Sequence, residues 1–206
     1  ATLAEESDLI SAENRLKEQR SKIEEQNNLY KDIFNVARPH LKKISKRLAR
    51  ATTDEEKDAA LRLAVVYGVF LKRRSNLTLM RSGGKISLSE LVYALRESCD
   101  ALTFCDVYSS VFSTCDGEFS SEQIEFIYEF FEDCIECTLP ELTACLVRLS
   151  DGKGELSCRI ALDNVKAAIP SGWRAKECEK LGATLSVVES DETLYATLTF
   201  AKEDRE

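Results

Sequence analysis

Four side chains of this sequence have types and positions that could support chemistry. His40 is the only histidine, and an imidazole is nucleophilic and titrates near neutral pH. Glu132 and Glu136 are four residues apart, about one helical turn, so their carboxylates would face the same way on a helix. Asp163 ends "RIALD", an alternating stretch that predicts a strand. Together they offer one candidate nucleophile and three carboxylates that could act as bases or ligands.

The end of the predicted strand at Asp163 has more than one interpretation. In one large class of nucleotide sites a strand ends in Asp-x-Gly, and the glycine lets the backbone turn around the base. Here Asn164 and Val165 follow Asp163. The pattern is compatible with a nucleotide site, with the remnant of one, or with an aspartate that caps a turn.

Composition indicates an ordered protein and argues against nucleic-acid binding. The 206 residues include only three prolines and eight glycines, and 44% are hydrophobic, which suffices for one large domain or two small ones. The net charge of −8 and the pI near 5.0 repel nucleic acids and anionic membrane surfaces. No run approaches the roughly 18 apolar residues of a spanning helix, and no signal peptide opens the chain. We therefore expect these residues to be soluble.

The eight cysteines indicate a reducing compartment. They lie from residue 99 onward, mostly in apolar stretches, as free buried thiols do, so we expect a cytoplasmic location. Cys134 and Cys137 form a lone CxxC inside a predicted helix, which favours core thiols over a metal site. Because residue 1 is Ala and Met80 is the only methionine, we also expect a longer protein, whose missing N-terminal part would carry any membrane anchor.

The first fifty residues carry a heptad repeat. Its apolar positions are Leu9, Leu16, Ile23, Tyr30, Ala37 and Ile44. This spacing predicts a long helix whose seam faces a partner helix. The companion positions are polar up to Asn27 and apolar from Phe34 onward. A two-stranded coiled coil over residues 1–29 should therefore widen into a bundle at about residue 30.

A helical hairpin is predicted over residues 30–82. The first helix should end near Ala51, and the capping box "TDEE" at 53–56 starts a second helix that ends near Arg81, at "SGG". Its apolar residues mostly share one face: Leu61, Val65, Val69, Leu77 and Met80. Such a hairpin can bury its apolar face by pairing with a second copy, which predicts a homodimeric four-helix bundle. Within it, "LKRRSN" at 71–76 is interpreted as a solvated charged face or a contact for a partner protein.

Residues 86–206 have the pattern of an α/β domain. "SLSE" and "SSEQ" cap two helices, at about 87–101 and 120–139, and "FCDVYSSVFS" between them alternates like a strand. Two strands joined by the turn "DGKG" come next, followed by a helix at about 173–181 and a closing hairpin. The order α-β-α-β-β-α-β-β predicts an α+β sandwich, with a helical layer on a mainly antiparallel sheet.

A helical hairpin followed by this order of elements resembles the cytoplasmic part of bacterial sensor histidine kinases. "RAKECEKLGATLSVVESDETLYATLTF" (174–200) is similar to the last helix, Leu-Gly-Gly turn and closing hairpin of their ATP-binding domain, with Ala183 in place of the second glycine. "FEDCIECTLPELTACLVRLSDGKGELSCRIALDN" (131–164) resembles the segment from the Asn-containing box to the adenine-binding aspartate. The resemblance implies a dimerisation and phosphoacceptor hairpin at 30–82 and a HATPase-like domain at 86–206.

The resemblance also implies roles in binding ATP and Mg²⁺. Glu132 falls on the glutamate usually assigned as base, Glu136 on the asparagine that holds magnesium, and Asp163 on the aspartate that accepts the adenine amino group. The glycine-rich phosphate loop should lie at about 165–173, but "VKAAIPSGW" contains one glycine. The nucleotide site is therefore expected to be degenerate. Judged alone, the two glutamates fit a solvated helix face, and Asp163 fits a turn cap.

His40 would be the phosphoacceptor of the hairpin. Pro39-His40-Leu41 resembles the Pro-His-apolar core of one kinase subgroup. Leu41 and Lys42 stand where other subgroups place an acidic residue directly after the histidine. The alternative is a partly buried helix residue next to a proline bend.

These features predict a signal-transduction module of a two-component sensor histidine kinase, with weakened or lost autophosphorylation. An active form would use MgATP, with Glu132 assisting and Asp163 holding adenine, and would pass the phosphoryl group from His40 to a response regulator. The alternative is a catalytically inert, pseudokinase-like dimeric scaffold that binds partners through its hairpin. In both cases we expect a homodimer, no nucleic-acid partner, and the cytoplasmic portion of a membrane-anchored sensor.

Overall fold

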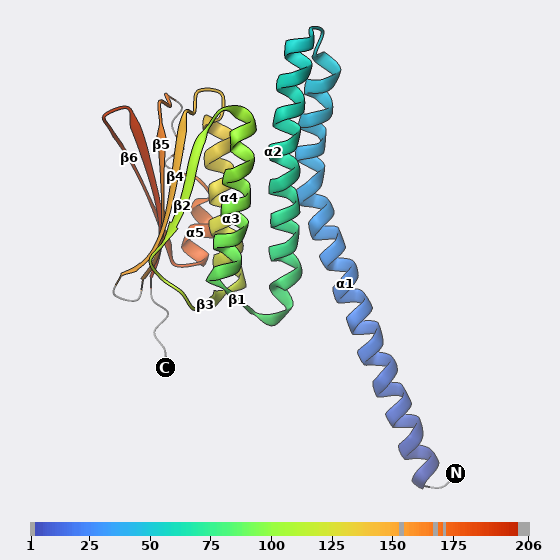
Figure 1. Ribbon diagram of the computed structural model, residues 1–206. Helices are drawn as coiled ribbons and strands as arrows, with labels where there is room; N and C mark the ends of the chain where they lie inside the picture. Colours follow the sequence, from blue (N-terminus) through green and yellow to red (C-terminus); the bar gives the residue numbers. More distant parts are fainter. Residues whose placement is uncertain (1–2, 153–154, 167–168, 171, 202–206) are drawn as a thin grey trace. The chain divides into compact units, whose positions relative to one another are not determined.

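The computed structural model describes residues 3–152, 155–166, 169–170 and 172–201, with side chains from residue 10 onward. The chain forms two compact units, one up to Lys42 and one from Lys43 onward. The first unit is the greater part of helix α1 (Leu3–Arg50), a single long ribbon in Figure 1. Apolar side chains along this unit are exposed: Leu16, Ile23, Tyr30, Phe34 and Leu41. The long helix predicted for the first fifty residues is confirmed.

A three-residue turn joins α1 to helix α2 (Asp54–Leu79), as the capping box predicted. Thr53 Oγ1 accepts a hydrogen bond from the Glu56 amide at 3.2 Å, and the Glu56 carboxylate accepts one from the Thr53 amide at 3.2 Å. This pair satisfies two of the amides that a helix start leaves free. After α2, the 3₁₀ turn Met80–Gly83 leads to Gly84, whose φ of 70° is left-handed and unstrained for glycine.

Helix α2 has an apolar face that the sequence analysis did not identify. Leu61 and Val65, on the expected apolar face, are exposed. The buried apolar residues are instead Ala60, Leu63, Val66, Tyr67 and Phe70, together with Leu77, which the expected face also contained. This second face shares one hydrophobic core with α3 (Leu88–Leu102) and α4 (Ser121–Thr138). Helix α2 therefore packs into the α/β body.

The rest of the second unit is an α/β sandwich. Its sheet has five strands in the order β2-β4-β5-β7-β6, with β2 parallel to β4 and the other neighbours antiparallel. The strands are β2 (Tyr108–Ser113), β4 (Ala144–Gly152), β5 (Glu155–Asp163), β6 (Ala183–Ser190) and β7 (Thr193–Phe200). Two short strands, β1 (Lys85–Ser87) and β3 (Glu118–Ser120), form a separate antiparallel pair.

Helices cover one face of the five-stranded sheet. In Figure 1, α3, α4 and the short α5 (Ala175–Lys180) lie on the same side of it, and α2 packs on α3 and α4. Inward-facing strand residues such as Val147 and Ile160 are fully buried against these helices. No helix of the described residues covers the opposite face. The predicted fold class, a long helical hairpin followed by an α+β sandwich, is confirmed, although β1 and β3 were not predicted.

The cysteines are free thiols, as expected. Five of the eight are buried: Cys99, Cys134, Cys145, Cys158 and Cys178. In the CxxC pair, Cys134 lies in the core and Cys137 is exposed, so the two thiols point to different environments. In the described part of the chain, no helix has both the length and the apolar composition needed to cross a membrane.

Candidate functional site

Helix α4 carries the acidic residues that the resemblance assigns to a nucleotide site. Ser120 caps its start by accepting a hydrogen bond from the Gln123 amide at 3.2 Å. Apolar residues such as Ile127 and Phe131 recur along the helix and are fully buried, which orients it. Four acidic side chains lie between its middle and its C-terminal end: Glu129, Glu132, Asp133 and Glu136.

Glu132 is enclosed between α4 and α2. It is 1% exposed, and its Oε2 accepts a hydrogen bond from Arg74 Nη1 at 2.9 Å. Loss of hydration raises the pKa of its carboxyl to about 8 and outweighs the opposite effect of the Arg74 guanidinium. The second oxygen, Oε1, has no hydrogen-bond partner among the described residues. Near neutral pH the structure therefore favours a protonated Glu132 that is sealed from solvent.

Two arginines bind the neighbouring acidic residues of α4. Arg74 of α2 and Arg174, which precedes α5, both form ion pairs with Glu129. Arg174 also pairs with Asp133, with 3.0 Å between Nη2 and Oδ2, and Trp173 Nε1 donates a hydrogen bond to Asp133 at 2.9 Å. Two guanidinium groups thus balance two carboxylates, and these contacts join α2, α4 and the segment before α5.

Trp173 packs beside α4 in the segment where a phosphate loop was expected. Its ring centroid lies 5.1 Å from that of Phe126 and 5.2 Å from that of Phe130. Val165 and Ile169 of the same segment are buried. Three residues of the segment lie outside the described part of the chain: Ala167, Ala168 and Ser171. The described positions therefore contribute packed side chains, where glycines would leave backbone amides open to a phosphate.

Glu136 also meets a cation of this chain. Its carboxylate binds the ammonium group of Lys43, in the C-terminal part of α1, with 2.5 Å between Nζ and Oε2. Glu132, one turn earlier, binds Arg74 of α2. The two carboxylates that were proposed as base and magnesium ligand are therefore both engaged by basic residues of the helices that precede the α/β domain.

Asp163 lies on the other face of the sheet. It is the last residue of β5 and is exposed, whereas Leu162 before it points toward the helices and is buried. Its Oδ1 accepts a hydrogen bond from Thr193 Oγ1 of β7 at 2.7 Å. The residue borders a hollow of about 590 Å³ that Tyr108 and Tyr195 also line. Asp163 thus holds two neighbouring strands together at the edge of this hollow.

The three candidate residues of the second unit do not converge on one site. Glu132 and Glu136 meet cations on one side of the helical layer, and Asp163 lies beyond the sheet. His40 belongs to the first compact unit and is 9% exposed. Among the described residues, no group of three metal-binding side chains could hold an ion. The second unit therefore does not bring Glu132, Glu136 and Asp163 together on one surface.

Sequence reasoning missed the basic residues that close this region. The interpretation of "LKRRSN" (71–76) as a solvated face or partner contact was wrong, since Arg74 binds the acidic residues of α4. Arg73 is buried, pairs with Glu97 of α3 and lies 4.4 Å from the ring centroid of Tyr93. A signal was present in the sequence, because the basic run on one predicted helix was complementary in charge to an acidic run on a later predicted helix.

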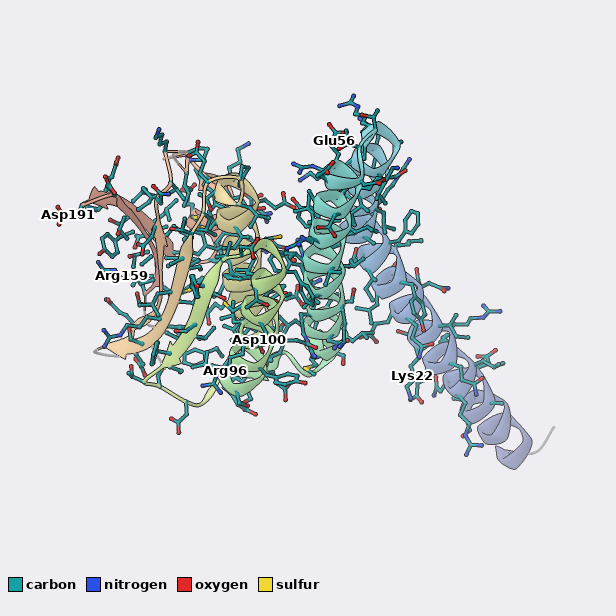
Figure 2. All side chains as sticks on the ribbon, turned by 45° about the horizontal axis from the view of Figure 1, so that its top comes forward. Lys22, Glu56, Arg96, Asp100, Arg159 and Asp191 are labelled. Carbon is teal, nitrogen blue, oxygen red and sulfur yellow. The ribbon has the colours of Figure 1, made fainter. Side chains whose placement is uncertain are left out.

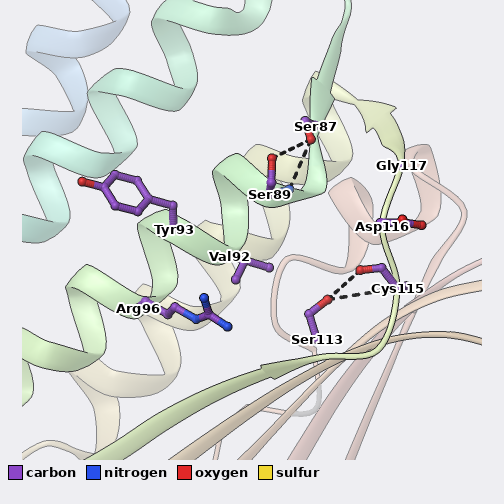
Figure 3. A pocket seen from close by; sticks show the side chains of 9 residues that line it. All are labelled: Ser87, Ser89, Val92, Tyr93, Arg96, Ser113, Cys115, Asp116 and Gly117. Carbon is purple, nitrogen blue, oxygen red and sulfur yellow. Dashed lines mark hydrogen bonds between the residues drawn. The ribbon is translucent and has the colours of Figure 1, made fainter.

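A separate hollow of about 270 Å³ lies at the start of α3, as Figure 3 shows. The hydroxyls of Ser87 and Ser89 are 2.8 Å apart, and Ser113 Oγ donates to the Cys115 carbonyl at 2.8 Å. Arg96 lines the same hollow and is exposed. The serine hydroxyls are therefore satisfied within the hollow itself, and none of the four candidate residues lines it.

No protein-family model matches this chain, and no curated protein matches its sequence. Similar solved structures include a bacterial phosphotransferase, at 10% identity over 82% of this chain and 91% of that one, with a TM-score of 0.48. A blue-light activated histidine kinase of Erythrobacter litoralis matches at 14% identity over 84% of this chain and 59% of its own, with a TM-score of 0.49. The Acinetobacter baumannii histidine kinase AdeS matches at 10% identity over 82% of this chain and 98% of its own, with a TM-score of 0.46. Two of these three are named as histidine kinases.

Proposed function

We propose that this chain is a dimeric signal-transduction module with the architecture of a histidine kinase cytoplasmic part, and that it does not turn over ATP. One observation carries the proposal. The acidic face of α4 is bound by basic residues of the same chain: Arg74 binds Glu132, and Lys43 binds Glu136. Arg174 binds Glu129 on the same helix. The groups that would have to receive a magnesium ion and a triphosphate are therefore already paired.

Binding of MgATP at this face would require several contacts to break together. The Arg74–Glu129 ion pair is largely buried, and breaking a buried pair by removing one partner typically costs about 3–5 kcal/mol. Once its arginines were displaced, α4 would present carboxylates to the negatively charged phosphates. Phosphoryl transfer depends on positioning and electrostatic stabilisation, and this arrangement provides neither for a γ-phosphoryl group.

The apolar side chains of the first unit support a homodimer. Leu16, Ile23 and Tyr30 recur every seven residues, and all three are exposed. A stripe of this kind is unfavourable in water, and a second copy would bury it as a coiled-coil seam. We infer that α1 supplies the dimer contact and transmits the signal.

Helix α2 offers a route from the helices to the α/β body. The ring of Phe70 is fully buried and lies 5.6 Å from that of Phe131 in α4, measured between centroids. The Tyr128 hydroxyl of α4 donates a hydrogen bond to the Phe70 carbonyl at 3.4 Å. Because interiors are close-packed, a displacement of α2 has to move α4 with it. In this proposal the output of the module is a shift of the α/β body.

His40 remains the proposed phosphoacceptor, with a different donor. If this chain binds no ATP, a phosphoryl group on His40 has to come from a second protein, such as a response regulator that carries an aspartyl phosphate. An inert scaffold, the alternative function, would carry no phosphoryl group on His40 under any of these conditions.

Calorimetry with MgATP on the purified chain tests the proposal. We expect no saturable heat at millimolar ATP and no labelled protein after incubation with radioactive ATP. Asp163→Asn is the matched variant, because it removes only the carboxylate that the resemblance assigns to adenine, and it should behave as the parent does. Saturable binding that Asp163→Asn abolishes, together with labelling that His40→Gln abolishes, would establish a working kinase and refute the proposal.

A further inference from the structure

The sheet face away from the helices, here called the outer sheet face, carries large apolar side chains. Four of them are exposed: Tyr108 (83%), Phe112 (58%), Leu146 (43%) and Val188 (56%). They come from β2, β4 and β6, so they extend from one edge of the sheet to the other. Contiguous apolar surface of this kind marks interaction sites on soluble proteins.

The strand register arranges the outer sheet face in rows. The apolar row consists of Ser110, Leu146, Ala161, Tyr195 and Val188. The next row, the basic row, consists of Phe112, Arg148, Arg159, Thr197 and Ser186. Neighbouring strands are about 4.8 Å apart, so a row runs ~19 Å across the five strands. An apolar band therefore lies directly beside a band that carries positive charge.

The two arginines of the basic row stand opposite each other. Arg148 of β4 and Arg159 of β5 are register partners, and like charges in that position destabilise a sheet. Arg159 lies over the ring of Tyr195, 4.4 Å from its centroid, and Figure 2 shows it on the side of the sheet away from the helices. No carboxylate of the described residues pairs with either guanidinium. In a chain of net charge −8, this pair indicates a surface that receives a negatively charged group.

We propose that the outer sheet face binds an amphipathic helix of a partner protein, with carboxylates along one border of its apolar side. A helix is a suitable partner because an apolar sheet face commonly packs against the apolar side of a helix. Helices α3 and α4 cover the inner face of this sheet in the same way. With a rise of about 1.5 Å per residue, ~13 residues of helix would span the apolar row. Apolar side chains at helical spacing would contact Leu146 and Tyr195, and acidic side chains on one flank would reach Arg148 and Arg159.

A third row lies on the other side of the apolar row from the arginines, and it carries no basic residue. This third row consists of Tyr108, Ala144, Asp163, Thr193 and Ser190. The hollow of about 590 Å³ at Asp163 opens between this row and the apolar row, and it has room for a large apolar side chain of the partner. The partner helix should therefore carry its acidic residues only on the flank that faces the arginines.

Fluorescence anisotropy with a synthetic helix tests the inference. The probe is an amphipathic peptide of about 16 residues with leucines on one side and glutamates along one flank, and the control peptide has lysines in place of the glutamates. We expect the acidic probe alone to bind, more weakly at high salt. The double variant Arg148→Gln, Arg159→Gln should weaken binding by about tenfold. Arg96→Gln, which removes an exposed arginine of α3, is the matched control and should bind as the parent does.

Several outcomes would overturn the inference. One is equal binding of the two peptides, and another is binding of the acidic probe that the double variant leaves unchanged, or no binding at all. Self-association that Phe112→Ser abolishes in sedimentation equilibrium would show that the face receives a second copy of the chain. Binding of a single-stranded RNA oligonucleotide that the double variant weakens would assign the face to nucleic acid. Circular dichroism establishes that each variant is folded, which exposed positions should permit.

Discussion

Glu132→Gln should remove a pH dependence of stability that the buried carboxyl imposes. The folded protein holds the Glu132 proton with a pKa of about 8, whereas the ordinary value of 4.5 applies in the unfolded chain. The folded state therefore binds the proton more tightly. Stability from this carboxyl is fully present below about pH 4.5 and is lost as the pH rises toward about 8. Between these limits the parent protein should lose about 1.4 kcal/mol per pH unit relative to the glutamine variant.

The size of this pH-dependent difference in stability follows for two pH values at which unfolding can be measured. From about pH 5.5 to about pH 7.5, the unfolding free energy of the parent minus that of Glu132→Gln should fall by roughly 2–3 kcal/mol. Groups that titrate in both proteins cancel in this difference. If the glutamine alters the contact with Arg74, that effect shifts the difference in unfolding free energy equally at both pH values. Only the change of this difference with pH therefore reports on the titration of Glu132.

Urea denaturation at the two pH values measures this difference, with the fluorescence of Trp173, the only tryptophan, as the probe. Glu122→Gln, the same substitution at an exposed position of α4, is the matched control and should show no comparable change. A difference between parent and Glu132→Gln that stays constant with pH would refute the reasoning. It would mean that Arg74 keeps Glu132 ionised throughout and that the acidic face of α4 is held by a full ion pair.

Phe70→Ala should lower the unfolding free energy by about 3–5 kcal/mol in urea, because the buried ring is shared by α2 and α4; a loss below about 1 kcal/mol would contradict the common core. Ile23→Asp should convert the dimer to a monomer in analytical ultracentrifugation, because it places a charge in the proposed seam, and an unchanged dimer would exclude that seam. A thiol reagent at mildly alkaline pH should modify exposed Cys137 first and reach Cys158, whose pKa burial raises to about 12, only after unfolding. Early reaction of Cys158 would show that the sheet opens against the helices.

Much of the fold could be predicted because its signals are local. The capping box at Thr53 and Glu56 lies within four consecutive residues, and the structure has both of its hydrogen bonds. Strands β4, β5 and β7 alternate between buried and more exposed positions, as their sequences indicated. The short strands β1 and β3 were missed because three residues are too few to show alternation.

The candidate site was predicted only as a set of residues. Glu132, Glu136 and Asp163 were identified from spacing, but spacing does not show which layer of the fold each side chain meets. The partner of Glu132 is Arg74, 58 residues earlier in the chain, and the partner of Asp163 is Thr193, 30 residues later. Contacts over such separations depend on how the helices and strands pack.

The sequence by itself determined the order of the longer elements, their approximate ends, and the heptad that predicts a partner helix. Only the tertiary structure decided which of the two apolar faces of α2 enters the core, and that Arg74 and Arg174 bind the acidic face of α4. The physical reason is that periodicity specifies which residues share a face of a helix or strand. What that face contacts is decided by the burial and charge of elements that lie far away in the chain.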